Sequence, residues 1–322
     1  NLLIEQIFTI PEEKTLYMTI LSTGLFGQTL EKFILANGAG RNGKGVINEL
    51  AGAMFGNYYY QCANSILLNP IDCKGANQTL AGMNHKRFVV YREPTSETTI
   101  KLNTDTIKEL TGGSSINARG LYEKNTTTHM KGTHILECNK RPLFSGETND
   151  ASIKRFIDFL FRSKFTSDEQ EVDHKSVFPM NIYYKSIEFQ ESMKYALFKI
   201  LIDYWGIYLQ SLNIDLLVPE TTRERGFNHL KDSDEFMNWF EDTYEKVDDE
   251  DQYIKMKDIF HLFKESTYYC NLSRPHKRTI TRTKLFENMK NNYFLKKAYC
   301  ERYHRKGKND TDVFLGYKLR EE

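Results

Sequence analysis

The chain has 322 residues, enough for about two domains. Of these, 40% are hydrophobic and 13% aromatic, as in a globular protein with an apolar core. The formal net charge of +1, from 44 basic and 43 acidic residues, favours no class of partner by itself. No apolar run approaches the roughly 20 residues that span a bilayer, and no secretory pattern opens the chain. The five cysteines are scattered without a C-x-x-C pair, which indicates reduced thiols in an intracellular, non-secreted protein.

Residues 1–30 form the first predicted segment. Apolar side chains recur there at helical spacing, first around Ile4 and Ile7 and again around Leu16 and Ile20. We therefore expect short helices packed before the first strand. Because the chain begins at Asn1 rather than at a methionine, we also expect a fragment of a longer polypeptide.

The stretch KFILANGAGRNGKGVINEL, residues 32–50, has the pattern of a strand, a glycine-rich loop and a helix. It contains G-x-x-x-x-G-K, whose backbone N–H groups surround phosphate oxygens while the lysine reaches the outer phosphates. The residues predicted to bind the nucleotide are Gly38, Gly40, Arg41, Asn42, Gly43, Lys44, Gly45 and Val46. Such loops normally supply a Ser or Thr hydroxyl to magnesium at the position of Gly45, and glycine has none.

An acidic strand end is expected about fifty residues downstream of such a loop, where a carboxylate holds magnesium or polarises the attacking water. The run RFVVYRE, residues 87–93, ends in Glu93, which we predict to be this carboxylate. Glu97 is a possible second acid. Arg92 stands where many such enzymes have an Asp, so the division of labour between Glu93 and Glu97 stays open.

Two further segments complete the predicted core. The run GTHILECNKRP, residues 132–142, is a buried-strand pattern ending in Asn139, whose amide can bond both a γ-phosphate oxygen and the lytic water. In NDASIKRFIDFLF, Lys154 and Arg155 precede an apolar strand. An arginine there can stabilise the transition state at a neighbouring subunit's γ-phosphate, and a surface ion pair is the alternative for it.

The rest of the chain is predicted to be mainly helical. The stretch 192–210 is apolar nearly all round, so we expect it to be buried against the core or a neighbouring subunit. Residues 231–251 hold two lysines and ten acidic residues, whereas residues 252–322 hold 17 basic and 8 acidic ones. Three helical patterns and a strand after a basic, glycine-containing turn indicate a winged-helix-like module there, which binds nucleic acid or a partner protein.

The order of these motifs resembles superfamily 3 helicases, in particular the helicase half of phage and plasmid primases and of poxvirus-type primase-helicases of large DNA viruses. The family's loop, G-x-G-x-N-G-K, is reproduced by Gly38, Gly40, Asn42, Gly43 and Lys44. Its K-x-L-T-G-G-x-x-x-x-A-R-x-L-Y segment is matched by Lys108, Leu110, Thr111, Gly112, Gly113, Ala118, Arg119, Leu121 and Tyr122. Its acid, its N-x-x-P sensor and its paired arginines correspond to Glu93, to Asn139 with Pro142, and to Lys154 with Arg155.

The resemblance implies an α/β fold with a P-loop, AAA+-like ATPase core at residues 31–165. The helical segment 1–30 would precede this core, and a helical segment 166–230 and the winged-helix-like module 231–322 would follow it. The implied cofactors are ATP and Mg²⁺, with Glu93, alone or together with Glu97, at the metal. The implied catalytic residues are Lys44, Glu93, Asn139 and Arg155.

The resemblance also implies an ATP-dependent helicase that forms a homohexameric ring on single-stranded or forked DNA, attached to an N-terminal primase portion and working in the host cytoplasm or nucleus if viral. Family members carry a hairpin that projects into the ring channel. Residues 116–136 alternate and turn around EKNTTTHMKG, which places Lys124, His129 and Lys131 at or near its tip. With Arg119, these side chains are predicted to contact DNA. The alternative is a P-loop ATPase for DNA packaging, or an assembly or origin-docking switch that does not unwind DNA.

Overall fold

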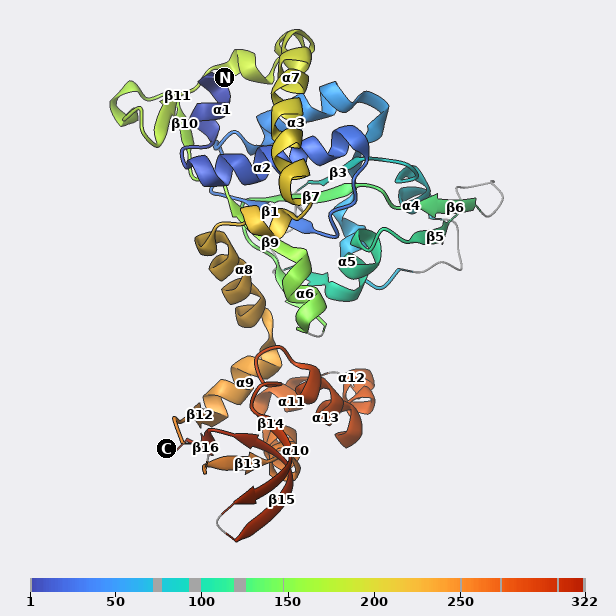
Figure 1. Cartoon of the computed structure of the whole chain (residues 1–322), viewed down its shortest axis with the longest axis vertical. Helices are drawn as coiled ribbons and strands as arrows, with labels where there is room; N and C mark the ends of the chain where they lie inside the picture. The colour runs from blue at the N-terminus through green and yellow to red at the C-terminus, as the bar shows by residue number, and fades with distance from the viewer. Residues whose placement is uncertain are drawn as a thin grey trace. The chain divides into compact units, whose positions relative to one another are not determined.

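The computed structural model consists of two compact units, which are described separately below (Figure 1). One comprises Asn1–Phe144 and Lys154–Phe227, and the other Ser145–Ile153 and Asn228–Glu322. No helix among the described residues is long and apolar enough to cross a membrane. The residues that the structure describes are 2–71, 77–92, 100–118, 126–146, 148–249, 251–272, 274–305 and 307–320.

A five-stranded parallel sheet forms the centre of the first unit. In spatial order its strands are β2 (Tyr59–Cys62), β3 (Phe88–Tyr91), β7 (Thr133–Cys138), β1 (Phe33–Asn37) and β9 (Phe156–Leu160). Every residue of β1 and β3 is buried, as expected for strands covered on both faces. The α/β fold class and the three buried strands predicted at residues 32–37, 87–93 and 132–142 are therefore confirmed.

One face of the sheet packs on helices, as Figure 1 shows for α2 (Pro11–Phe26), α3 (Lys44–Phe55) and α7 (Ile187–Ser211). Ile34 and Ala36 of β1 belong to the same apolar core as these helices. Proline at the first position of α2 and left-handed Gly27 after its end delimit that helix. With α1 (Leu2–Ile7) before it, α2 confirms the short helices predicted within residues 1–30.

Helix α7 is longer than the apolar stretch predicted at residues 192–210. It begins after Ser186, whose hydroxyl accepts a 3.1 Å hydrogen bond from the Phe189 N–H. Leu197 and Leu201 are buried against the core, whereas the side chain of Tyr195 is 70% exposed. Burial therefore holds for one face of this helix only.

Shorter elements surround the sheet. They are η1 (Gly56–Tyr58), η2 (Asn64–Leu67), α4 (Gln78–Gly82), β4 (Lys101–Asn103), α5 (Thr104–Thr111), β5 (Ser115–Ala118), β6 (Thr126–His129), β8 (Leu143–Ser145), α6 (Asp150–Arg155), β10 (Lys164–Thr166), η3 (Glu169–Glu171), β11 (Val177–Pro179), η4 (Ile182–Lys185), η5 (Ile214–Leu217) and α8 (Glu220–Ser233). Helices α6 and α8 each contribute residues to both units.

The second unit has its own apolar core, which includes Phe240, Phe263 and Phe314. The predicted helices and terminal strand are present, and the strand pairs in a hairpin, β14–β15, beside β13. The elements are α9 (Glu235–Thr243), β12 (Tyr244–Lys246), β13 (Tyr253–Lys255), α10 (Met256–Glu265), α11 (Thr267–Asn271), α12 (Arg274–Thr279), α13 (Arg282–Asn291), β14 (Tyr299–Arg305), β15 (Lys308–Leu315) and β16 (Tyr317–Leu319). The winged-helix arrangement itself stays a prediction.

A buried histidine in the sheet makes the stability of the first unit depend on pH. The Tyr91 hydroxyl lies 2.8 Å from Nδ1 of His134, and burial lowers the pKa of His134 from 6.5 to about 4. Between these two pH values the unfolded chain binds a proton that the folded chain does not, so stability falls as the pH falls. We expect His134→Gln to remove up to about 3 kcal/mol of this dependence, measured by denaturant unfolding between pH 7 and pH 4.

His174→Asn is the matched control, because His174 is exposed in the same unit. It should keep the dependence of the parent chain. An equal slope in the parent and in His134→Gln would contradict the assignment to His134.

Candidate nucleotide-binding site

The glycine-rich loop joins β1 to α3 through a run of left-handed backbone. Gly40, Arg41 and Gly43 have φ values of 84°, 49° and 83°. The Gly40 N–H donates to the Gly38 carbonyl at 2.8 Å, and the helix begins directly at Lys44. The first N–H groups of a helix have no intrahelical acceptor, so the loop and the start of α3 form an anion-binding cradle.

Neighbouring atoms pack closely against the loop at Gly38 and Gly43 but not at Gly45. A Cβ at Gly38 would lie 2.6 Å from the carbonyl oxygen of Phe161, and one at Gly43 would lie 2.5 Å from Cγ1 of Ile7. A Cβ at Gly45 would meet no atom within 4 Å. Glycine is therefore required by packing at the first two positions, whereas Gly45 borders open space.

The Lys44 side chain connects the loop to the neighbouring strand. Its Nζ donates to the carbonyl oxygens of Cys138 at 2.8 Å and Gly38 at 3.2 Å, and to Oδ1 of Asn139. Because Asn37 and Cys138 are partners in the β1–β7 pairing, the loop after β1 and the residue after β7 lie side by side. The structure thus brings together Lys44 and Asn139, both predicted from the sequence.

An acid that the sequence analysis did not select, Glu137 on β7, lies beside this pair. Asn48 of α3 donates to its Oε1 at 2.7 Å, and the buried Tyr17 hydroxyl donates to Oδ1 of Asn48 at 2.7 Å. Burial, the largest influence, raises the pKa of Glu137, although the Asn48 hydrogen bond and the charges of Arg92 and Lys44 oppose it. An acidic residue between Leu136 and Cys138 of a mostly buried strand was the available signal in the sequence.

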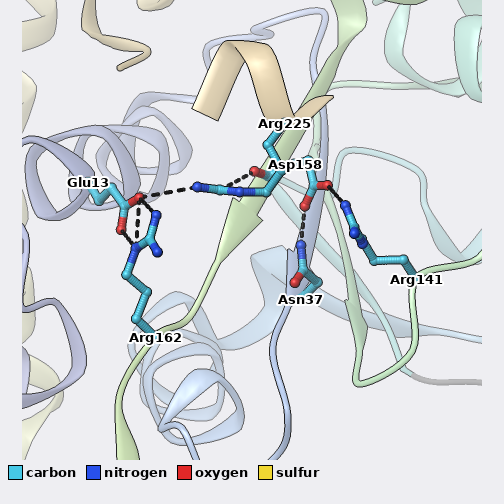
Figure 2. Close-up of polar contacts among 6 residues, drawn as sticks. All are labelled: Glu13, Asn37, Arg141, Asp158, Arg162 and Arg225. Atoms are coloured by element: carbon cyan, nitrogen blue, oxygen red, sulfur yellow. Dashed lines mark hydrogen bonds and ion pairs between the residues drawn. The ribbon is translucent and has the colours of Figure 1, made fainter. Parts of the chain in front are cut away.

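A second acid, Asp158, anchors the segment that follows Asn139. It is fully buried on β9 and accepts hydrogen bonds from Asn37, at the end of β1, and from Nη1 of Arg141 at 3.2 Å (Figure 2). Arg141 lies two residues beyond Asn139. This ion pair therefore holds the sensor segment against the strands that carry the cradle.

Glu13 of α2 continues the polar network (Figure 2). Arg162 donates to both of its carboxylate oxygens at 3.1–3.3 Å, and Arg225 of α8 lies 3.7 Å away. Arg225 also donates to the backbone carbonyl of Asp158 at 2.9 Å. The network ties α2 and α8 to the segment after β9, whose Phe161 carbonyl closes the cradle.

Arg155 is not part of this assembly. It ends α6 directly before β9, and the pairing of Phe33 with Phe156 places it at the start of the sheet, whereas the cradle follows the end of β1. The length of β1, about 17 Å, separates the two. At its own end of the sheet, Nη2 of Arg155 lies 3.4 Å from the Glu31 carboxylate.

The predicted DNA hairpin is shorter than expected. Strands β5 and β6 pair antiparallel, with Ser115 opposite His129 and Ala118 opposite Thr126. His129 therefore lies at the open end of the hairpin, where its ring stacks on His85 at 4.9 Å, and Lys131 lies beyond β6. The placement of His129 and Lys131 near the tip was wrong, because His129 pairs with Ser115, the first residue of β5, and Lys131 lies beyond the end of β6.

Four predicted site residues lie outside the described part of the chain: Glu93, Glu97, Arg119 and Lys124. Their roles stay predictions. Among the residues that are described, no group of three or more His, Cys, Asp or Glu side chains is placed to hold a metal ion. The donors described near the cradle suit a hydrated magnesium ion carried by the nucleotide better than a cage of protein ligands.

Comparison with known proteins gives distant relatives. No known protein-family profile matches the chain. It is 28% identical over 204 residues to Primase D5 of fowlpox virus (strain NVSL), which covers 61% of this chain and 25% of that protein. It is 26% identical over 255 residues to Putative helicase L207/L206 of Acanthamoeba polyphaga mimivirus, which covers 77% of this chain and 26% of that protein. The chain thus spans about a quarter of the length of these curated relatives.

Among solved structures, the apo C-terminal region of NrS-1 matches with a TM-score of 0.53 and 12% identity, over 98% of this chain and 74% of that one. At this identity the match shows a shared fold. The sequence relatives show distant homology to a viral primase and to putative viral helicases, which confirms the predicted resemblance.

One added methyl group should lower the unfolding free energy strongly at Gly43 and only slightly at Gly45. Gly43→Ala places a Cβ against Ile7 on a left-handed backbone, so we expect a loss of about 2 kcal/mol or more in unfolding free energy. Gly45→Ala enters open space and should change stability by less than about 1 kcal/mol. Denaturant unfolding of both variants tests this, and equal losses would contradict the described loop geometry.

Proposed function

We propose that this chain is the ATP-hydrolysing motor of a viral-type primase-helicase and moves along single-stranded DNA. The observation that carries the proposal is the meeting of Lys44, at the start of α3, with Asn139, directly after β7. The phosphate cradle and the Asn139 amide therefore lie next to each other. Homology to a viral primase and to a putative viral helicase, of whose lengths the chain spans about a quarter, supports this function.

In this proposal backbone N–H groups of the glycine-rich loop and of the start of α3 bind the β- and γ-phosphates. The Lys44 ammonium leaves the Cys138 carbonyl and moves to the outer phosphates, while the Asn139 amide orients the attacking water. Magnesium neutralises charge on the phosphates when bound. Glu93, alone or together with Glu97, would hold it, because Gly45 offers no side-chain oxygen.

The position of Arg155 supports a site shared between subunits. Arg155 lies beside Glu31, at the opposite end of the sheet from the cradle of its own chain, so it would serve the cradle of a second copy of the chain. We propose a ring, homohexameric by family resemblance, in which Arg155 stabilises the transition state in the neighbouring subunit. The β5–β6 hairpin, with Arg119 and Lys124, would contact DNA. The second unit, whose residues 252–322 carry 17 basic and 8 acidic side chains, would bind nucleic acid or a partner protein as a winged-helix module. An ATPase rate that rises with single-stranded DNA distinguishes a translocase from a DNA-independent switch.

Removing the charge of Lys44 should abolish hydrolysis. We expect Lys44→Ala and the longer Lys44→Met to lose at least about a hundredfold in ATPase rate, because only backbone N–H groups would remain at the phosphates. Lys199→Ala, at an exposed position of α7, is the control and should keep full activity. Circular dichroism checks the fold, and normal turnover in folded Lys44 variants would refute the nucleotide assignment.

Mixing two inactive variants tests the shared site. Arg155→Ala should bind ATP nearly normally and turn it over at least about a hundredfold more slowly. Subunits that lack Lys44 keep the arginine, and subunits that lack Arg155 keep the cradle, so mixed rings should regain activity. Arg223→Ala, an exposed arginine of α8, should stay active alone. Mixed rings that form but remain inactive would contradict the simple shared-site arrangement.

A further inference from the structure

Directly after β3, this chain has an arginine where many P-loop ATPases have an Asp. In those enzymes an Asp at this position and the loop Ser or Thr together hold magnesium. Here Arg92 directly follows β3, and its guanidinium lies 3.0 Å from the carboxylate of Glu49 on α3. Gly45 supplies no hydroxyl. Two of the usual magnesium contacts are therefore absent from their usual positions.

Glu137 lies on the adjacent strand at the same level of the sheet. Tyr91 of β3 pairs with Leu136 of β7, so the next residues along the two strands, Arg92 and Glu137, are neighbours. The neighbouring β1 partner of Glu137 is Ala36, two residues before Gly38. The carboxyl group thus lies between the end of β3 and the cradle.

A buried chain of hydrogen bonds sets the orientation of this carboxyl group. Tyr17, fully buried, donates to Asn48, and Asn48, 1% exposed, donates to Oε1 of Glu137. Within the described residues, Oε2 of Glu137 accepts no hydrogen bond from another side chain. One oxygen is therefore held in place, and the other can accept a bond from a bound group.

The charges and the free space around Glu137 favour a hydrated cation nearby. Lys44 and Asn48 are one turn apart on α3, so Glu137 faces the helix surface directly behind the phosphate-binding lysine. Gly45 leaves open space at the same end of the helix. Burial without a full ion pair leaves the carboxylate short of positive charge, and a magnesium ion on the nucleotide would provide it.

We propose that Glu137 takes over the role of the Asp that many P-loop ATPases carry at the position of Arg92 and accepts, through Oε2, a hydrogen bond from water around the magnesium ion of the bound nucleotide. The inference rests on the proposed nucleotide site. Glu137 is a positioning residue in this arrangement, since it contacts the ion only through a water molecule. The hydrogen bond from Asn48 fixes the orientation of its carboxyl group. Loss of Glu137 should weaken magnesium-dependent binding specifically.

The test is calorimetric binding of a non-hydrolysable ATP analogue, with magnesium and with EDTA. Glu137→Gln keeps an oxygen that can accept the Asn48 bond but removes the charge. We expect its affinity to match the parent chain in EDTA and to be about tenfold weaker with magnesium, as for the loss of an outer partner of a metal. Glu49→Gln is the matched control, an acid of the same cluster bonded to Arg92, and should show no magnesium-specific loss.

The outcomes separate this inference from the function on which it rests. If the parent chain binds no nucleotide, the proposed function fails and the inference fails with it. If the parent shows magnesium-dependent binding and Glu137→Gln equals it, or if Glu49→Gln loses as much, only the role of Glu137 is refuted. If Glu137→Gln unfolds, Glu137→Asp, with its charge withdrawn by one methylene, must show the same magnesium-specific loss. Adding Gly45→Ser should restore part of that loss, because its hydroxyl can join the magnesium shell.

Discussion

The parallel pairing of β1 with β7 is the constraint on which the candidate site depends. It aligns Asn37 with Cys138, so the glycine loop and the sensor residue leave the sheet at the same edge. Lys44 can then reach Asn139 and the Cys138 carbonyl, which lie far away in the sequence. The same rule places ligands at the carboxyl ends of strands throughout open parallel sheets.

Buried charge is the cost of holding these strand ends in place. Glu13 and Asp158 are almost completely buried, and each is compensated by an arginine that reaches in from the surface of the unit. Removing one member of such a pair lowers stability more than replacing both members by apolar residues, because the remaining charge is buried without a partner. The network in Figure 2 therefore links the sensor segment, the cradle and α8, because the loss of one member leaves a buried charge unpaired.

The common direction of the parallel strands also places the predicted site residues at two different ends of the sheet. Residues after the strands, such as Lys44, Asn139 and Glu137, share the cradle edge, whereas Arg155 precedes a strand and lies at the other edge. Arg155 therefore lies about the length of a strand away from the cradle of its own chain. Apolar side chains of α7, such as Tyr195, are exposed outside the core of the unit.

Local sequence alone determined the features that depend on a few consecutive residues. The strand, glycine loop and helix of residues 32–50, the two buried strands that follow and the N-terminal helices could be predicted, because backbone conformation and short apolar runs are local properties. Lys44 and Asn139 could also be selected, since their types and positions after strands carry the chemistry.

Features that depend on strand pairing and on burial could not be predicted in this way. The register of β5 with β6 places His129 at the open end of the hairpin, and only one face of α7 is buried. Tertiary structure alone distinguished Glu137 and Asp158 from the other acids, because the environment of a carboxyl group is set by residues distant in the sequence, here Asn48, Tyr17 and Arg141.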